Sequence, residues 1–219
     1  MRKFFYLMVF LIGFYSTFLM TFPAKTIAGY FLTENNISYS KIEGNLFSLK
    51  IYDIEYKKLY IPKLFIENNF VNIISKINME NFFKVNFLER KAKLKLTDLP
   101  LENYQKNPIL KGKITTSIKF TKNGRYILTK GNGKLLIKEF KKLGLRDIQV
   151  NWKLAPEDKK SKISAEIHGK NINGTFTGKL RLPVDNTKDV RIKGIFKGKV
   201  FGRPVTQEIN INPFLLEGF

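Results

Sequence analysis

The chain has 219 residues, of which 43% are hydrophobic and 26% are charged, a composition typical of a folded protein. It contains no cysteine, which excludes disulfides, thiolate metal sites and a cysteine nucleophile. The formal net charge of +21 favours a polyanion, an anionic lipid surface or an acidic protein as partner. A genome biased toward AT-rich codons, which encode lysine, would give the same charge without any ligand.

The N-terminal segment is predicted to be a membrane anchor. Residues 4–22 carry no charged side chain and follow Arg2 and Lys3. As a helix, this stretch would span about 28 Å, close to the roughly 30 Å hydrocarbon core of a bilayer. A cleaved signal peptide is the alternative, but neither Ala24 nor Ala28 completes a small-x-small cleavage site at the end of the apolar run. We therefore expect an uncleaved signal-anchor.

Positive charge at the N-terminus sets the expected orientation. Arg2 and Lys3 prefer the cytoplasmic side, whereas a long downstream domain crosses a membrane largely regardless of its charge. The sequence therefore predicts a single-pass protein of the bacterial inner membrane, with the anchor and its flanks over residues 1–25 and a periplasmic β domain over residues 26–219. This location counts against nucleic acid as a partner.

The remaining sequence has the periodicity of strands. Residues 23–32 are expected to form a short helix, and from about Ile37 the apolar residues recur at every second position. The strictest alternation places polar residues between Ile148, Val150, Trp152 and Leu154. A second strand over residues 190–196 places Ile192 and Phe196 on one face. Helical periodicity is weak, with possible short pieces at 71–76 and 101–106, so the pattern predicts an all-β, mostly antiparallel domain.

Turn signals divide the expected strands. Asn123-Gly124 lies between two alternating runs and predicts a β-hairpin, and Asn173-Gly174 and residues 131–133 are two further turn candidates. Apolar residues change from odd to even positions after Ile51. That change of phase predicts a β-bulge near Ile51.

Residues that could perform chemistry are few. His168 is the only histidine, and it falls on the polar face of an expected strand. The carboxylates show no local pairing that indicates acid–base catalysis. Residues 131–134 read Gly-Asn-Gly-Lys but lack the rest of a phosphate-binding loop. We expect a non-enzymatic protein with no catalytic residue, no metal and no cofactor.

A short motif follows the predicted anchor. Pro23-Ala24 is succeeded by Ile42, Gly44 and Ser48 in the stretch Ile-Glu-Gly-Asn-Leu-Phe-Ser. This resembles the start of type II secretion system protein N, in which the serine is followed by glycine, here replaced by Leu49. The layout also resembles the wider group of AsmA-like membrane-anchored β proteins. The resemblance implies an inner-membrane protein with a periplasmic β domain, accessory to protein secretion or to lipid movement between membranes, and it brings no catalytic residues.

Two functions follow from these expectations, and they differ in how the apolar face of the sheet is covered. The first is a non-enzymatic accessory subunit of a type II, or general, protein secretion system, which binds other secretion proteins. The alternative is a lipid-binding or lipid-transfer protein that holds phospholipid in an open apolar groove. The candidate groove residues are Ile148, Val150, Trp152, Leu154, Ile192 and Phe196. A curved sheet with an open groove and a closed β-sandwich both fit the alternation.

Overall fold

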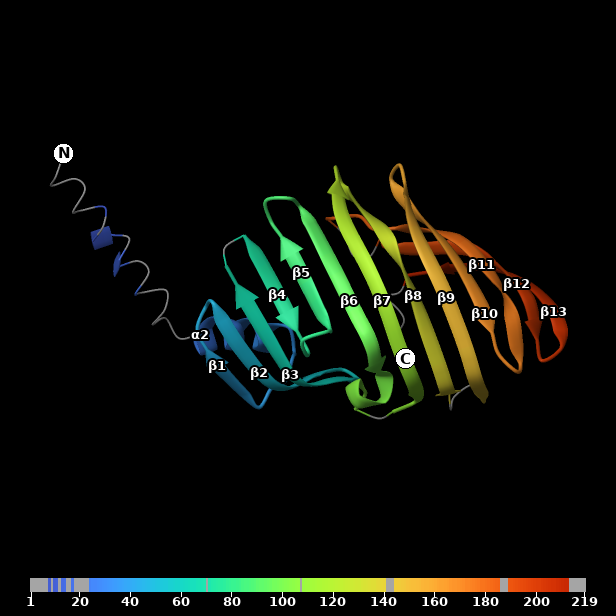
Figure 1. Ribbon diagram of the computed structural model, residues 1–219, viewed down its shortest axis with the longest axis horizontal. Coiled ribbons are helices and arrows are strands. Elements are labelled where there is room, and N and C mark those ends of the chain that lie inside the picture. Colours follow the sequence, from blue (N-terminus) through green and yellow to red (C-terminus); the bar gives the residue numbers. More distant parts are fainter. Residues whose placement is uncertain are drawn as a thin grey trace.

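The described part of the protein is mostly β structure, preceded by a short helix. The computed structural model describes residues 8, 10–11, 13–14, 17, 24–69, 71–106, 108–140, 144–185 and 189–212. Helix α2 (Ala24–Glu34) precedes thirteen strands that form one sheet, and the order of strands in the sheet is their order in the sequence. Each strand pairs antiparallel with the next, so the sheet is one continuous meander (Figure 1).

The longest strands, the seventh to the ninth, lie in the middle of the sheet. The first six are β1 (Lys41–Gly44), β2 (Ser48–Tyr56), β3 (Leu59–Asn68), β4 (Asn72–Lys76), β5 (Phe82–Asn86) and β6 (Lys91–Pro100). A short 3-10 helix, η1 (Leu101–Tyr104), follows β6. The remaining strands are β7 (Leu110–Asn123), β8 (Tyr126–Phe140), β9 (Leu145–Glu157), β10 (Lys160–His168), β11 (Ile172–Arg181), β12 (Arg191–Val200) and β13 (Arg203–Ile211).

The sheet is open, with β1 and β13 as its two edges. Figure 1 shows that it twists strongly and that the C-terminal strands turn behind β9 and β10. Of the two expected architectures, the described residues therefore form the single curved sheet and not the sandwich. The prediction of an all-β, antiparallel fold is confirmed.

The two faces of the sheet differ in chemistry because side chains alternate along each strand. One face, here called the apolar face, carries residues such as Leu94, Ile118, Leu135, Trp152 and Phe176. The opposite face, here called the basic face, carries the intervening residues, among them Lys93, Lys119, Lys153, Lys179 and Lys193.

Helix α2 covers the apolar face at the N-terminal end of the sheet. Leu32 of α2 packs with Ile42, Ile51 and Ile54, which are between 3% and 8% exposed. Half-buried residues of β2 and β3, including Leu64, surround this cluster. The helix predicted over residues 23–32 is confirmed within the described residues, and it closes one end of an otherwise single-layered structure.

The β-bulge expected near Ile51 is wrong, because Tyr52 faces Lys63 and Ile54 faces Ile61, so the β2–β3 ladder keeps one register. The change of phase comes instead from Asp53, whose φ of 50° makes the backbone irregular without an extra residue. As a result Ile51 and Ile54, three residues apart, are both buried on the apolar face. An extended strand without this irregularity would have placed them on opposite faces.

The other local predictions had mixed outcomes. The Asn123-Gly124 hairpin is confirmed: Asn123 faces Tyr126, and Gly124 has a φ of 58°. The turns predicted at Asn173-Gly174 and at residues 131–133 are wrong, because the first pair lies within β11 and the second stretch lies within β8. The piece at 71–76 is strand β4 instead of helix, whereas 101–106 contains η1.

The predicted membrane anchor is a separate matter. In the parts of the chain that the structure describes, no helix is long and apolar enough to cross a membrane. Most of residues 4–22, and Pro23, lie outside those parts. The anchor remains a prediction from the sequence.

Candidate functional site

The six predicted groove residues share the apolar face of the sheet. Leu154 and Val150 face Ile163 and Ile167 on β10, and Trp152 faces Ala165 between them. The same row then continues through Phe176 to Phe196. Of the six, Ile148, Leu154 and Phe196 are buried, and Val150, Trp152 and Ile192 are half-buried.

Glycines lie beside the aromatic rings of this row. Strands β11 and β12 each carry a Gly-x-Phe-x-Gly segment, at residues 174–178 and 194–198, and the two segments pair with each other. A Cβ built on Gly194 would lie 2.5 Å from Cζ of Phe176, and one on Gly174 would lie 2.8 Å from Cε2 of Phe196. The rings therefore lie over glycine backbone, which has no side chain to project beside them. This part of the face is consequently flat.

Sequence reasoning did not include Phe176 among the groove residues. Phe176 lies directly between Ala165 and Phe196 in the row. The repeated Gly-x-Phe-x-Gly segment was the signal that could have identified it. Such a segment places an aromatic ring and two flanking glycines on the same face of a strand.

The described strands from β6 to β13 belong to one open sheet, and the described chain contains no second sheet. An apolar sheet face in a globular domain normally packs against another sheet or against helices. On this face Val150, Trp152 and Ile192 are partly exposed, whereas Ile148, Leu154 and Phe196 are buried, so the apolar face is accessible only in part.

The contact between β8 and β10 turns the C-terminal strands toward β8. The backbone N–H of Thr129 donates to Oγ of Ser161 at 2.7 Å, and both residues are almost fully buried. Farther along, the N–H of Ile127 donates to the carbonyl of Leu182 at 2.8 Å. These bonds span the end of β9 and bring the β11–β12 connection against the start of β8.

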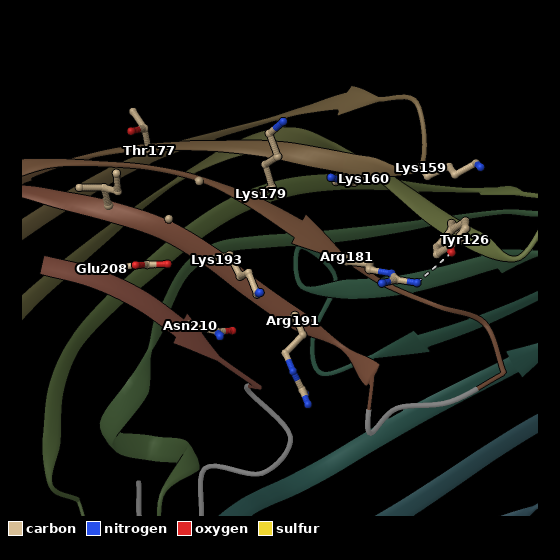
Figure 2. Close-up of a pocket in the computed structure, with 13 residues that line it drawn as sticks. Tyr126, Lys159, Lys160, Thr177, Lys179, Arg181, Arg191, Lys193, Glu208 and Asn210 are labelled. Carbon is tan, nitrogen blue, oxygen red and sulfur yellow. Dashed lines mark hydrogen bonds between the residues drawn. The ribbon is translucent and has the colours of Figure 1, made fainter.

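A groove of about 820 Å³ lies on the basic face at this end of the sheet (Figure 2). Its cationic lining residues are Lys159, Lys160, Lys179, Arg181, Arg191 and Lys193. The guanidinium of Arg181 donates to the hydroxyl of Tyr126 at 3.0 Å and lies 5.3 Å from the centre of its ring. Tyr126 therefore fixes the position of Arg181 beside the groove.

Like charges oppose each other in this groove. Lys179 faces Lys193, and Arg181 faces Arg191, across the β11–β12 ladder. Glu208 is the acidic residue that lines the groove, and Glu157 lies 3.4 Å from Nζ of Lys179. Directly opposed like charges destabilise an antiparallel pair, so an anion bound between them would remove an unfavourable interaction.

The motif residues near the N-terminus build a turn. Ile42 is buried in β1, Gly44 ends that strand with a φ of 103°, and Ser48 begins β2. The side-chain oxygen of Asn45 accepts hydrogen bonds from the backbone N–H groups of Phe47 and Ser48, each at 3.0 Å. Ala24 is the first residue of α2. The motif thus has a structural role in the β1–β2 hairpin.

Chemically reactive side chains do not converge elsewhere. His168 is exposed, and its Nε2 lies 3.9 Å from the exposed carboxylate of Glu166. No group of three metal-ligating side chains occurs among the residues with described positions. The two faces of the sheet are the features that could carry a function.

Comparisons with known proteins returned no relative. The chain matches no protein-family model, no curated protein and no solved structure. The resemblance to type II secretion system protein N and to AsmA-like proteins therefore rests on the sequence motifs alone.

Proposed function

We propose that this protein is a non-enzymatic lipid-binding protein that holds acyl chains against its apolar face. The observation that carries the proposal is the apolar strip from Leu135 on β8 to Phe196 on β12, which lies on a single open sheet and includes the partly exposed side chains of Val150, Trp152 and Phe176. Burial of apolar surface contributes about 25 cal/mol per Å², so an acyl chain in this position would bind favourably.

The arrangement of aromatic rings supports this proposal. Trp152, Phe176 and Phe196 lie in one row across four strands, and Trp152 and Phe176 remain half-exposed. The glycines beside them keep the surface low enough for an extended chain to lie along it. The predicted anchor over residues 4–22 would keep the sheet at the bacterial inner membrane, the source of such lipids.

The test uses photo-crosslinking in the full-length protein expressed in bacterial cells. A benzophenone amino acid replaces Phe176 or Val150 on the apolar face, and Thr175 or Asn151 on the basic face serves as the matched control. We expect phospholipid adducts, identified by mass, at positions 176 and 150 and not at 175 and 151. Equal labelling of both faces, or no lipid adduct at all, would contradict the proposal.

A second candidate is the accessory subunit of a type II secretion system. Besides the motif, one observation favours it: β13 is an edge strand of nine residues with one neighbour, β12. An edge strand can pair with an extended segment of a partner protein. Crosslinks from position 206 of β13 to a secretion protein, with no lipid on the apolar face, would favour this function over lipid binding.

A further inference from the structure

Lysines on the basic face stand in register across most of the sheet. Lys84 of β5 faces Lys93, which faces Lys119, which faces Lys130 of β8. On the C-terminal side, Lys162 of β10 faces Lys179, which faces Lys193 of β12.

The two sets belong to one row. Lys162 faces Ala155 of β9. The β8–β9 ladder pairs Gly131 with Leu154, and Lys130 and Ala155 are the next residues of those strands. A single line therefore crosses eight strands and is interrupted only at Ala155. It is called the lysine row below, and its members are Lys84, Lys93, Lys119, Lys130, Lys162, Lys179 and Lys193.

This arrangement is unfavourable for the isolated fold. Like charges directly opposite each other destabilise a strand pair. Within the described residues, Lys179 is the member of the row that has a carboxylate in salt-bridge range, Glu157 at 3.4 Å. Lys93 lies 5.8 Å from the ring centre of Phe82. The other members of the row form no salt bridge and no cation–π contact within the described residues.

The charge is concentrated in a line. One neighbouring row on the same face consists of Lys95, Ser117, Asn132, Lys153, Ser164, Thr177, Ile195 and Glu208. The row on the other side includes Lys91, Thr121, Leu128, Glu157, Lys160, Arg181 and Arg191, so its cations lie only toward its two ends. A compositional excess of lysine would spread evenly over the three rows. Strands lie about 4.8 Å apart, so the lysine row extends about 34 Å along the sheet.

Both ends of the lysine row lie in hollows of the basic face. Lys179 and Lys193 line the groove in Figure 2, where Arg181 and Arg191 add to the positive charge. Lys84, Lys93 and Lys119 line a second groove of about 380 Å³. A line of cations that begins and ends in grooves is complementary to a narrow anionic chain more than to a flat anionic surface.

We propose that the lysine row is a binding track for a linear polyanion, a chain that carries phosphate or carboxylate groups on a non-aromatic backbone. Single-stranded nucleic acid binds through aromatic side chains on which its bases stack. The larger groove has one aromatic residue in its lining, Tyr126, and its ring already contacts the guanidinium of Arg181. The larger groove therefore offers cations without a free stacking platform, and the lining of the second groove contains one aromatic residue, Phe120.

The test measures binding of labelled inorganic polyphosphate to the full-length protein in detergent micelles by fluorescence anisotropy. The row variant carries Lys119→Gln, Lys130→Gln, Lys162→Gln and Lys193→Gln, which are all exposed and lack a described salt bridge. The control variant has the same charge change on the same face outside the row: Lys95→Gln, Lys134→Gln, Lys153→Gln and Lys197→Gln.

We expect the row variant to bind polyphosphate about tenfold or more weakly, and the control variant to bind less than about threefold more weakly. The slope of log K against log salt should fall by about 3 in the row variant, since each lost contact with a single-stranded polyanion contributes roughly 0.7. The row variant should also melt at a higher temperature than the natural protein at low salt, because repulsion between strands is relieved.

Three results would overturn the proposal. Equal loss of binding in the row and control variants would show that net charge alone attracts the polyanion. Tighter binding of a single-stranded oligonucleotide than of polyphosphate, at equal phosphate concentration, would assign the track to nucleic acid. Row-dependent capture of phosphatidylglycerol vesicles without row-dependent polyphosphate binding would assign it to a membrane surface. Lipid crosslinks on the apolar face are independent of all three results.

Discussion

At the scale of single residues, glycines determine how the aromatic row is packed. Gly194 faces Gly178 across the β11–β12 ladder, and the ring of Phe176 lies against both. Glycine in a strand interior normally weakens a sheet, because it contributes no side chain to packing. Here the neighbouring ring occupies the vacant space, so the absence of a side chain is what the packing requires.

Replacing Gly194 with alanine should therefore destabilise the protein. The new Cβ would lie 2.5 Å from Phe176 Cζ and 2.7 Å from the Cα of Gly178, so the ring or the strand must move. We expect a loss of about 1–3 kcal/mol in the free energy of unfolding, measured by chemical denaturation. Lys197→Ala on the exposed basic face of the same strand is the control, with a change within about 0.5 kcal/mol. Unchanged stability in Gly194→Ala would show that the ring is not held there.

The sequence predicted the residues of the apolar strip but not their contacts. Alternation alone placed Trp152 and Phe196 on an apolar face, and the structure agrees. Alternation could not place these two residues in one row, because their alignment depends on the registers of three successive hairpins. The turn at Asn173-Gly174 was predicted wrongly because Gly174 lies within a strand. Its missing side chain leaves room for the ring of Phe196, and it is not a turn residue.

At the scale of elements, η1 attaches the β6–β7 connection to the sheet. Oε2 of Glu102 accepts the backbone N–H of Gly112 on β7 at 3.0 Å. Hydrogen bonds from backbone N–H groups hold the pKa of the Glu102 carboxyl below its usual range. Gln105 completes the attachment, because its side chain bonds the carbonyl groups of Leu101 and Leu110.

The Glu102 contact should make this connection sensitive to acid. A lowered pKa in the folded state means that the contribution to stability is present above the unfolded pKa of about 4.3 and is lost as pH falls through the folded pKa. Glu102→Gln should destabilise the protein by about 1 kcal/mol at pH 7 and by much less at pH 3. Thermal melts of both proteins across this pH range provide the measurement. A constant difference between pH 7 and pH 3 would exclude an ionised Glu102 as the acceptor.

Strand positions were more predictable than connections at this scale. The hairpin at Asn123-Gly124 came from a local pattern that fixes backbone geometry, and the phase change after Ile51 located an irregularity at Asp53 although it is not a bulge. The β8–β10 contact through Thr129 and Ser161 had no such signal. It arises where the β8–β9 ladder ends at Gly131 and Leu154, although β9 continues beside β10 as far as Glu157.

At the scale of the whole molecule, burial is unevenly distributed. The largest cluster of buried apolar residues lies at the N-terminal end, where α2 covers β1 to β3. The far edge, β13, has mostly exposed side chains and one neighbouring strand. Local stability follows buried apolar contacts and protected hydrogen bonds, so the two ends of the sheet should differ in stability.

Hydrogen exchange followed by mass spectrometry should reveal this gradient in the full-length protein. We expect peptides from β2, which contain Ile51 and Ile54, to exchange more slowly than peptides from β13. Bound polyphosphate should slow exchange in β10 to β12, where the lysine row ends. Uniform exchange across the sheet would mean that it opens as one cooperative unit and that the core under α2 confers no local protection.

Because the strands follow one another in strict sequence order, the length of this molecule is a variable that evolution can adjust freely. Every strand finds its hydrogen-bonding neighbours next to it in the chain, so a hairpin gained or lost at the β13 edge requires no rethreading of the rest. Each added strand would lengthen both the apolar strip and the line of cations by about 4.8 Å. The length of both surfaces is therefore proportional to the number of strands in the sheet.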